Sequence, residues 1–117
     1  MNGQYLSNVL ARLAPNQGFA IYAGKVENEA DYNSNVAFNN PEQKPAWSAV
    51  EAGKVDEQWV IIRGMRNGKL TACDFTQLPD VPLTDAQKTA WETYRQALRD
   101  ITTQPDPFNI NWPVPPE

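Results

Sequence analysis

The sequence predicts a small single domain of the α+β class, mainly helical, that ends in an extended, proline-rich tail. Three observations support this class. Two segments carry apolar residues at helical spacing, one short apolar run is bounded by glycines, and residues 102–117 contain five prolines. With 117 residues, the chain is long enough to form one compact core.

Residues 1–53 are predicted to form a short helix, a strand and an irregular segment. Apolar residues recur at helical spacing over about residues 4–14, and Pro15 then stops the pattern. The apolar run at residues 19–23 is too short to show a period, and its flanking glycines favour a strand. Residues 27–40 are polar and contain five asparagines, so we expect them to be irregular or loosely helical.

Residues 55–75 support two incompatible predictions. Asn67-Gly68 lies between two apolar runs and tolerates the positive φ of a type I′ turn, which favours a β-hairpin. A single helix is the alternative, although Gly64 and Gly68 each disfavour it by about 1 kcal/mol relative to alanine. The helix would place five apolar residues on one stripe: Val55, Trp59, Ile62, Leu70 and Cys73. Local signals alone slightly favour the hairpin.

A second helix is predicted from Asp85 to about Thr102. Thr84 and Gln87 have the spacing of a capping box, in which each side chain bonds the backbone amide of the other residue. One face of this helix is apolar and must be buried; it comprises Trp91, Tyr94, Leu98 and Ile101. Pro105 and the prolines beyond it exclude a helical tail, so the apolar residues of the tail must dock as an extended strip.

The composition excludes several classes of function. The chain has no histidine, which excludes Ser-His-Asp and Cys-His catalysis and histidine metal ligands. A net charge of −4 argues against binding to nucleic acid or to an anionic membrane. The lone Cys73 suits a reducing cytoplasm and is expected to be a small buried residue. We expect neither a secretion signal nor a membrane span.

No metal or cofactor is expected either. Asp74, Asp80 and Asp85 lie close together in the sequence, but they lack the spacing and the glycine of a calcium loop. Asp74 and Asp80 are expected to cap turns and helix starts instead.

Three segments together resemble the C-terminal module of the bacteriophage tail assembly chaperone family, which also occurs in tail-fibre assembly proteins. They are Cys73-Asp74-Phe75-Thr76-Gln77-Leu78-Pro79-Asp80-Val81-Pro82-Leu83-Thr84, Trp91-Glu92-Thr93-Tyr94-Arg95-Gln96-Ala97-Leu98-Arg99-Asp100-Ile101, and Asn111-Trp112-Pro113-Val114-Pro115-Pro116. Phe75 stands where similar sequences usually have tryptophan. The resemblance implies that residues 54–117 form one helical module with its tail, which favours the helix for residues 55–73 and docking of the tail on this chain.

The resemblance also implies a non-catalytic function, in which the chain binds a phage tail or tail-fibre polypeptide during assembly in the host cytoplasm. The expected partner-binding residues are Trp91, Tyr94, Arg95, Arg99 and Trp112. Aromatic residues at helical spacing are more often internal core, and arginines one turn apart more often form a solvated face. Two alternative functions are a structural tail or fibre component of the virion and a phage-encoded inhibitor or adaptor that binds a host protein. A homo-oligomer is compatible with the sequence.

Overall fold

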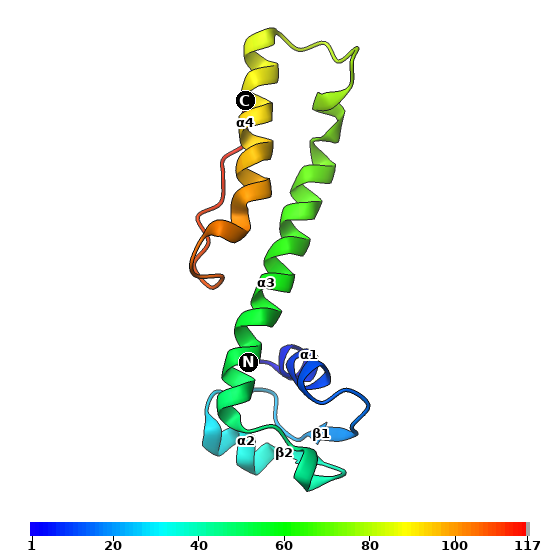
Figure 1. Ribbon diagram of the computed structural model, residues 1–117, viewed down its shortest axis with the longest axis vertical. Helices are drawn as coiled ribbons and strands as arrows, with labels where there is room; N and C mark the ends of the chain where they lie inside the picture. The colour runs from blue at the N-terminus through cyan, green and yellow to red at the C-terminus, as the bar shows by residue number, and fades with distance from the viewer. Residues whose placement is uncertain (117) are drawn as a thin grey trace. The chain divides into compact units, whose positions relative to one another are not determined.

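The computed structural model describes residues 1–116 and is mainly helical with one small sheet (Figure 1), so the predicted α+β class is confirmed. Its helices and strands are α1 (Gly3–Leu13), β1 (Phe19–Ile21), α2 (Glu29–Asn35), β2 (Val36–Phe38), α3 (Trp47–Ala72) and α4 (Asp85–Arg99). Three 3-10 turns complete the list: η1 (Pro41–Gln43), η2 (Asp74–Gln77) and η3 (Asp100–Thr103). No helix among these residues is long and apolar enough to cross a membrane.

The chain forms two compact units, Met1–Glu57 and the part from Gln58 onward, and α3 contributes residues to both. The sequence-based division at residues 53 and 54 stays a prediction about domains. Each unit has its own cluster of buried apolar side chains.

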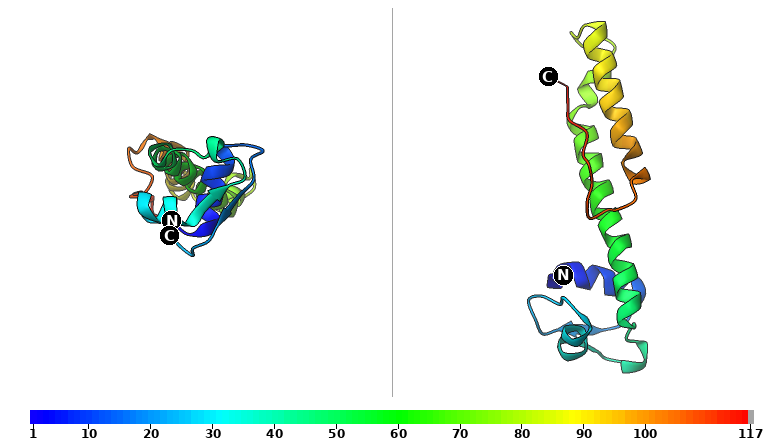
Figure 2. Two further views of the ribbon diagram at one scale, coloured as in Figure 1. Left: turned by 90° about the horizontal axis from the view of Figure 1, so that it is seen from below. Right: turned by 90° about the vertical axis from the view of Figure 1, so that its left-hand side faces the viewer.

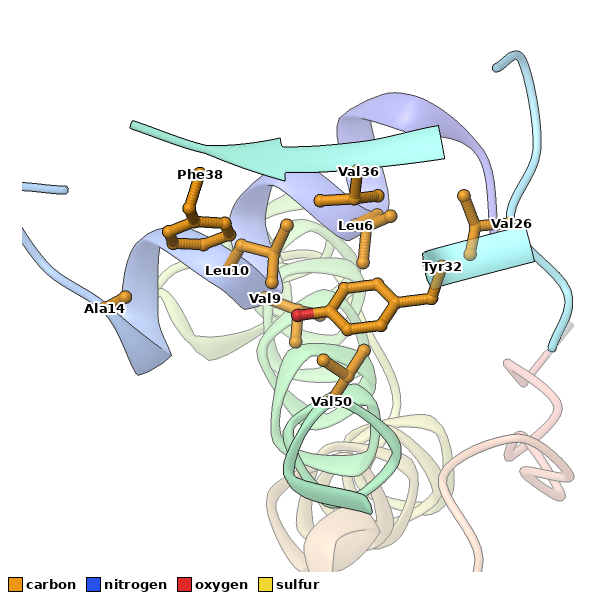
Figure 3. Close-up of a cluster of buried hydrophobic side chains, with 9 residues drawn as sticks. All are labelled: Leu6, Val9, Leu10, Ala14, Val26, Tyr32, Val36, Phe38 and Val50. Atoms are coloured by element: carbon orange, nitrogen blue, oxygen red, sulfur yellow. The ribbon is translucent and has the colours of Figure 1, made fainter. Parts of the chain in front are cut away.

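The N-terminal unit buries α1 against the small sheet, α2 and the start of α3. Nine side chains form this core, and Figure 3 shows them pointing toward one another; they are Leu6, Val9, Leu10, Ala14, Val26, Tyr32, Val36, Phe38 and Val50. The predicted helix and strand are both present, as α1 and β1. Helix α1 starts where the Asn2 side chain accepts a hydrogen bond from the Tyr5 amide, at 2.8 Å.

Residues 27–40 are more regular than the sequence predicts. Asn28 caps α2, and the chain then enters β2, which pairs antiparallel with β1. Phe19 lies opposite Phe38, and their rings stack with centroids 5.3 Å apart. Strand β2 could not be recognised from its three residues, because a strand this short is specified by its partner rather than by its own pattern.

A buried carboxylate holds α1 to α3 within the N-terminal unit. Glu57 is almost fully buried and accepts hydrogen bonds from Arg12 and Asn8. The Tyr5 hydroxyl donates to the backbone carbonyl of Lys54, 2.8 Å away. These contacts satisfy polar groups that would otherwise be costly to bury.

Residues 47–72 form one continuous helix, so the hairpin alternative for residues 55–75 is wrong and the helix is confirmed. No glycine in residues 1–116 has a positive φ, so Gly68 does not adopt the turn conformation that Asn67-Gly68 permits. Burial of Ile62 and Cys73 offsets the low helix propensity of the two glycines.

The second predicted helix is confirmed as α4, which begins with the complete capping box between Thr84 and Gln87. The 3-10 turn η3 extends it to Thr103, close to the predicted end. From Gln104 to Pro116 the chain has no helix or strand, as the prolines require.

Tyr32 gives the N-terminal unit a pH dependence that can be tested. Its hydroxyl donates to the Pro45 carbonyl at 2.6 Å, and burial raises the pKa of Tyr32 to about 12 from an ordinary value of 10.0. Because this pKa is raised on folding, the contribution of Tyr32 to stability is complete below pH 10 and is lost as the pH rises to 12.

We therefore expect Tyr32→Phe to lower the free energy of unfolding by about 1 kcal/mol at neutral pH, through loss of the hydrogen bond. The gap between wild type and variant should close between pH 10 and 12, which urea denaturation at a series of pH values would measure. Tyr22→Phe is the control, because Tyr22 is 73% exposed and its variant should match wild type throughout. A gap that stays constant through pH 12 would contradict this prediction.

Candidate functional site

The C-terminal unit is built around an antiparallel pair formed by the second half of α3 and α4, on which the tail lies (Figure 2). Its main core cluster consists of the buried residues Cys73, Tyr94 and Leu98, with Leu70, Trp91 and Trp112 packed against them. Leu98 is fully buried, and Cys73 is buried as predicted. The apolar face predicted for residues 91–101 therefore forms internal core.

Arg95 links α4 to the end of α3 with three polar contacts. Its guanidinium donates to the Leu70 carbonyl at 2.9 Å, to the Cys73 sulfur at 3.1 Å, and to an Asp74 carboxylate oxygen at 2.9 Å. Burial by itself lowers the pKa of Arg95, but the hydrogen bonds and charges of Cys73 and Asp74 outweigh that effect and raise it. Arg95 is therefore always charged, and it adds a second donor to the Leu70 carbonyl in the last turn of α3, which also accepts from the Cys73 amide at 3.1 Å.

Arg66 makes a similar contact in the opposite direction. Its guanidinium lies 3.5 Å from the backbone carbonyl of Arg99, the last residue of α4. An arginine of each helix thus contacts the C-terminal end of the other helix, where the helix dipole favours a cation. The two arginines fix how far the helices can slide past each other.

The tail docks on its own unit, as predicted. Trp112 packs against the core cluster, and the Lys69 ammonium lies over its ring, 5.2 Å from the centroid. The side-chain amide of Gln104 exchanges two hydrogen bonds of 2.9 Å with the backbone of Asn111. Gln58 donates to the carbonyl of the buried Pro107 at 3.3 Å, and this bond holds the tail's turn at residues 107–108 against α3.

The structure brings together four of the five residues expected to bind a partner. Trp91, Tyr94 and Trp112 share the core cluster, and Arg95 borders it through its bond to Cys73. Arg99 lies apart from the cluster and is exposed. Their part in partner binding stays a prediction, since their observed contacts are with this chain.

Sequence reasoning missed the exposed end of the helix pair, which is formed by η2. Phe75 and Leu78 are each 54% exposed. The Phe75 ring lies edge-on to Trp91 with centroids 6.4 Å apart, and Trp91 meets Tyr94 in the same way at 5.7 Å. We call Phe75, Leu78 and Trp91 the hairpin-end patch, because they lie at the end of the helical hairpin that α3, η2 and α4 form. Phe75 belongs to the sequence signature, but its exposure depends on the turn, which no periodicity reveals.

The acidic residues near this end do not form a metal site in the part of the chain that the structure describes, where no group of three potential ligands is found. Asp74 pairs with Arg95 instead of capping η2, whose start has no side-chain cap. The expectation that Asp74 is a capping residue is therefore wrong, because an arginine across the helix pair competes for its carboxylate.

One comparison with known proteins gives a match. A family model described as "Phage tail assembly chaperone protein" matches residues 59–117, half of the chain. No curated protein and no solved structure matches the chain. The matched residues include the C-terminal half of α3, the hairpin-end patch and α4.

Arg95 and Arg99 should respond very differently to substitution. We expect Arg95→Ala to lower the free energy of unfolding by about 1–3 kcal/mol, because it removes a charged donor from the Leu70 carbonyl and the ion-pair partner of Asp74. Arg95→Lys should recover only part of the loss, since an ammonium cannot reproduce the planar fork.

Arg99→Ala is the matched control, because Arg99 is exposed and its variant should stay within about 0.5 kcal/mol of wild type. Urea denaturation measures all three variants. Equal losses for Arg95→Ala and Arg99→Ala would show that the three contacts of Arg95 do not stabilise the unit.

Proposed function

This chain belongs to the phage tail assembly chaperone protein family, and we propose that it binds a tail or tail-fibre polypeptide during assembly without catalysing a reaction. The binding would cover apolar surface or unpaired strand edges of the client until its own subunits assemble. Such a function places the chain in the host cytoplasm while virions are assembled. The family match supports this proposal for the C-terminal unit, where it lies.

The observation that carries the proposal is the hairpin-end patch. Two large apolar side chains, Phe75 and Leu78, are more than half exposed although an apolar core lies directly beside them. Clustered exposed apolar side chains mark protein interaction sites, and aromatic residues contribute most to such contacts. The patch is therefore the surface we assign to the client.

The five residues expected from the sequence then divide by exposure. Trp91 is half-buried and belongs to the patch, where its ring meets that of Phe75, while Tyr94 and Arg95 hold α4 in place beneath it. Trp112 fastens the tail, and Arg99 is exposed at the far end of α4. We propose that Trp91 and Arg99 contact the client and that the other three position them.

Loss of the hairpin-end patch should impair client binding without unfolding the chaperone. We expect the double variant Phe75→Ser, Leu78→Ser to weaken the interaction at least about tenfold, because both exposed anchors are removed. The measurement is the fraction of tail-fibre or tail polypeptide from the same phage that is recovered soluble and assembled on co-expression.

Val114→Ser is the control, because Val114 is 85% exposed in the tail and lies outside the patch. Circular dichroism would establish that each variant is folded. A folded double variant that supports client assembly as well as wild type would refute the assignment of the patch. Composition analysis of purified virions separates a transient chaperone, which should be missing, from a structural component, which should be present in fixed stoichiometry.

A further inference from the structure

A second surface of the C-terminal unit lies on α3, on the side opposite its buried stripe. Over residues 60–72, eight residues share this side and all are exposed: Val60, Ile61, Gly64, Met65, Asn67, Gly68, Thr71 and Ala72. None is charged, and Met65 is 48% exposed. We call this surface the outer face of α3. It is largely apolar on a helix whose other side already forms the core, so the usual amphipathic pattern is absent.

The glycines of the outer face have no explanation within this chain. A β-carbon built at Gly64 or Gly68 meets nothing within 4 Å, so neither glycine is required by close packing in the described structure. Both have helical backbone without positive φ, where alanine would be more favourable. Beside them, Ile61 and Met65 project as exposed anchors. Glycines between larger side chains allow another helix backbone to approach closely.

The charged residues of α3 indicate what kind of partner helix would fit the outer face. The segment from Gln58 to Ala72 contains three charged residues, Arg63, Arg66 and Lys69, and all are basic. Among residues 1–116, none of the three forms a salt bridge with a carboxylate. Arg66 bonds only oxygens of Asn67 and Arg99, and Lys69 lies over Trp112. By their positions along the helix, Arg63 and Lys69 fall on opposite borders of the outer face.

We propose that the outer face of α3 binds an amphipathic α-helix of another protein that has small and apolar residues at its centre and acidic residues along its borders. Its carboxylates would pair with the cations of α3, and its apolar stripe would cover Ile61 and Met65 across the two glycines. A second copy of this chain fits poorly, because it would bring the same basic borders to the interface. This surface is independent of the hairpin-end patch, and the proposal does not rest on the client-binding function.

The test uses the full chain and two designed helical peptides that share an Ala/Leu face and differ only in their borders, which are Glu in one and Lys in the other. Fluorescence anisotropy should show the Glu peptide binding at least about tenfold more tightly, with the preference shrinking at high salt. Ile61→Gln with Met65→Gln should abolish binding. Arg63→Gln should weaken the Glu peptide several-fold, whereas Lys88→Gln, which changes the net charge equally from α4, should not.

Substituting the two glycines should change the stability of the free chain and its peptide binding in opposite directions. Gly64→Ala with Gly68→Ala should raise the melting temperature of the free chain, because alanine favours the helix and the space is open. The same variant should bind the Glu peptide at least about tenfold more weakly, because added methyl groups block close approach. The Phe75→Ser, Leu78→Ser variant should bind the peptide like wild type.

Three results would overturn the proposal. One is equal or absent binding of the two peptides. Another is unchanged peptide binding by the alanine variant. The third is a dimer of the free chain in sedimentation experiments that Met65→Gln dissociates, because it would assign the face to a second copy.

Discussion

The C-terminal unit depends on the contact between Arg95 and the end of α3. One guanidinium donates to a carbonyl in the last turn of α3, contacts the only cysteine and pairs with a carboxylate that begins the next turn. Because all three acceptors lie within five residues, a single side chain fixes the position of α4 along α3. The aromatic contacts of Trp91 and Tyr94 follow from that position, as does the place where Trp112 can dock.

The fold of this unit was predictable wherever an element is determined by its own local sequence. The capping box and the apolar spacing of α4 are local, and the prolines of the tail exclude a helix by covalent geometry. Asn67-Gly68 shows the opposite case, because a strong turn signal was overridden by burial on the other side of the helix. The apolar stripe was compatible with a helix but did not outweigh the turn signal; the resemblance of the neighbouring segments to a known family did, and the family match supports that resemblance.

The candidate site was harder to predict than the fold, because spacing shows which residues share a face but not what covers that face. Trp91, Tyr94 and Trp112 were correctly expected to lie together, yet they pack on this chain. The exposed groups, Phe75 and Leu78 at one end and Ile61 and Met65 along α3, owe their exposure to the path of the chain around them. Arg95 was expected on a partner-facing surface, but its bonding groups come from residues about twenty positions earlier.

Because Cys73 lies where α4 packs on the end of α3, the reactivity of its thiol reports on that packing. The thiol is buried under the Arg95 guanidinium, and the sequence contains no other cysteine to compete for a reagent. Alkylation therefore requires that α4 or the tail move away from Cys73, so the labelling rate of the unmodified chain measures how often the packing of the C-terminal unit opens. A ligand that stabilises the packing around Cys73 would lower the alkylation rate, and a ligand that disrupts this packing would raise it.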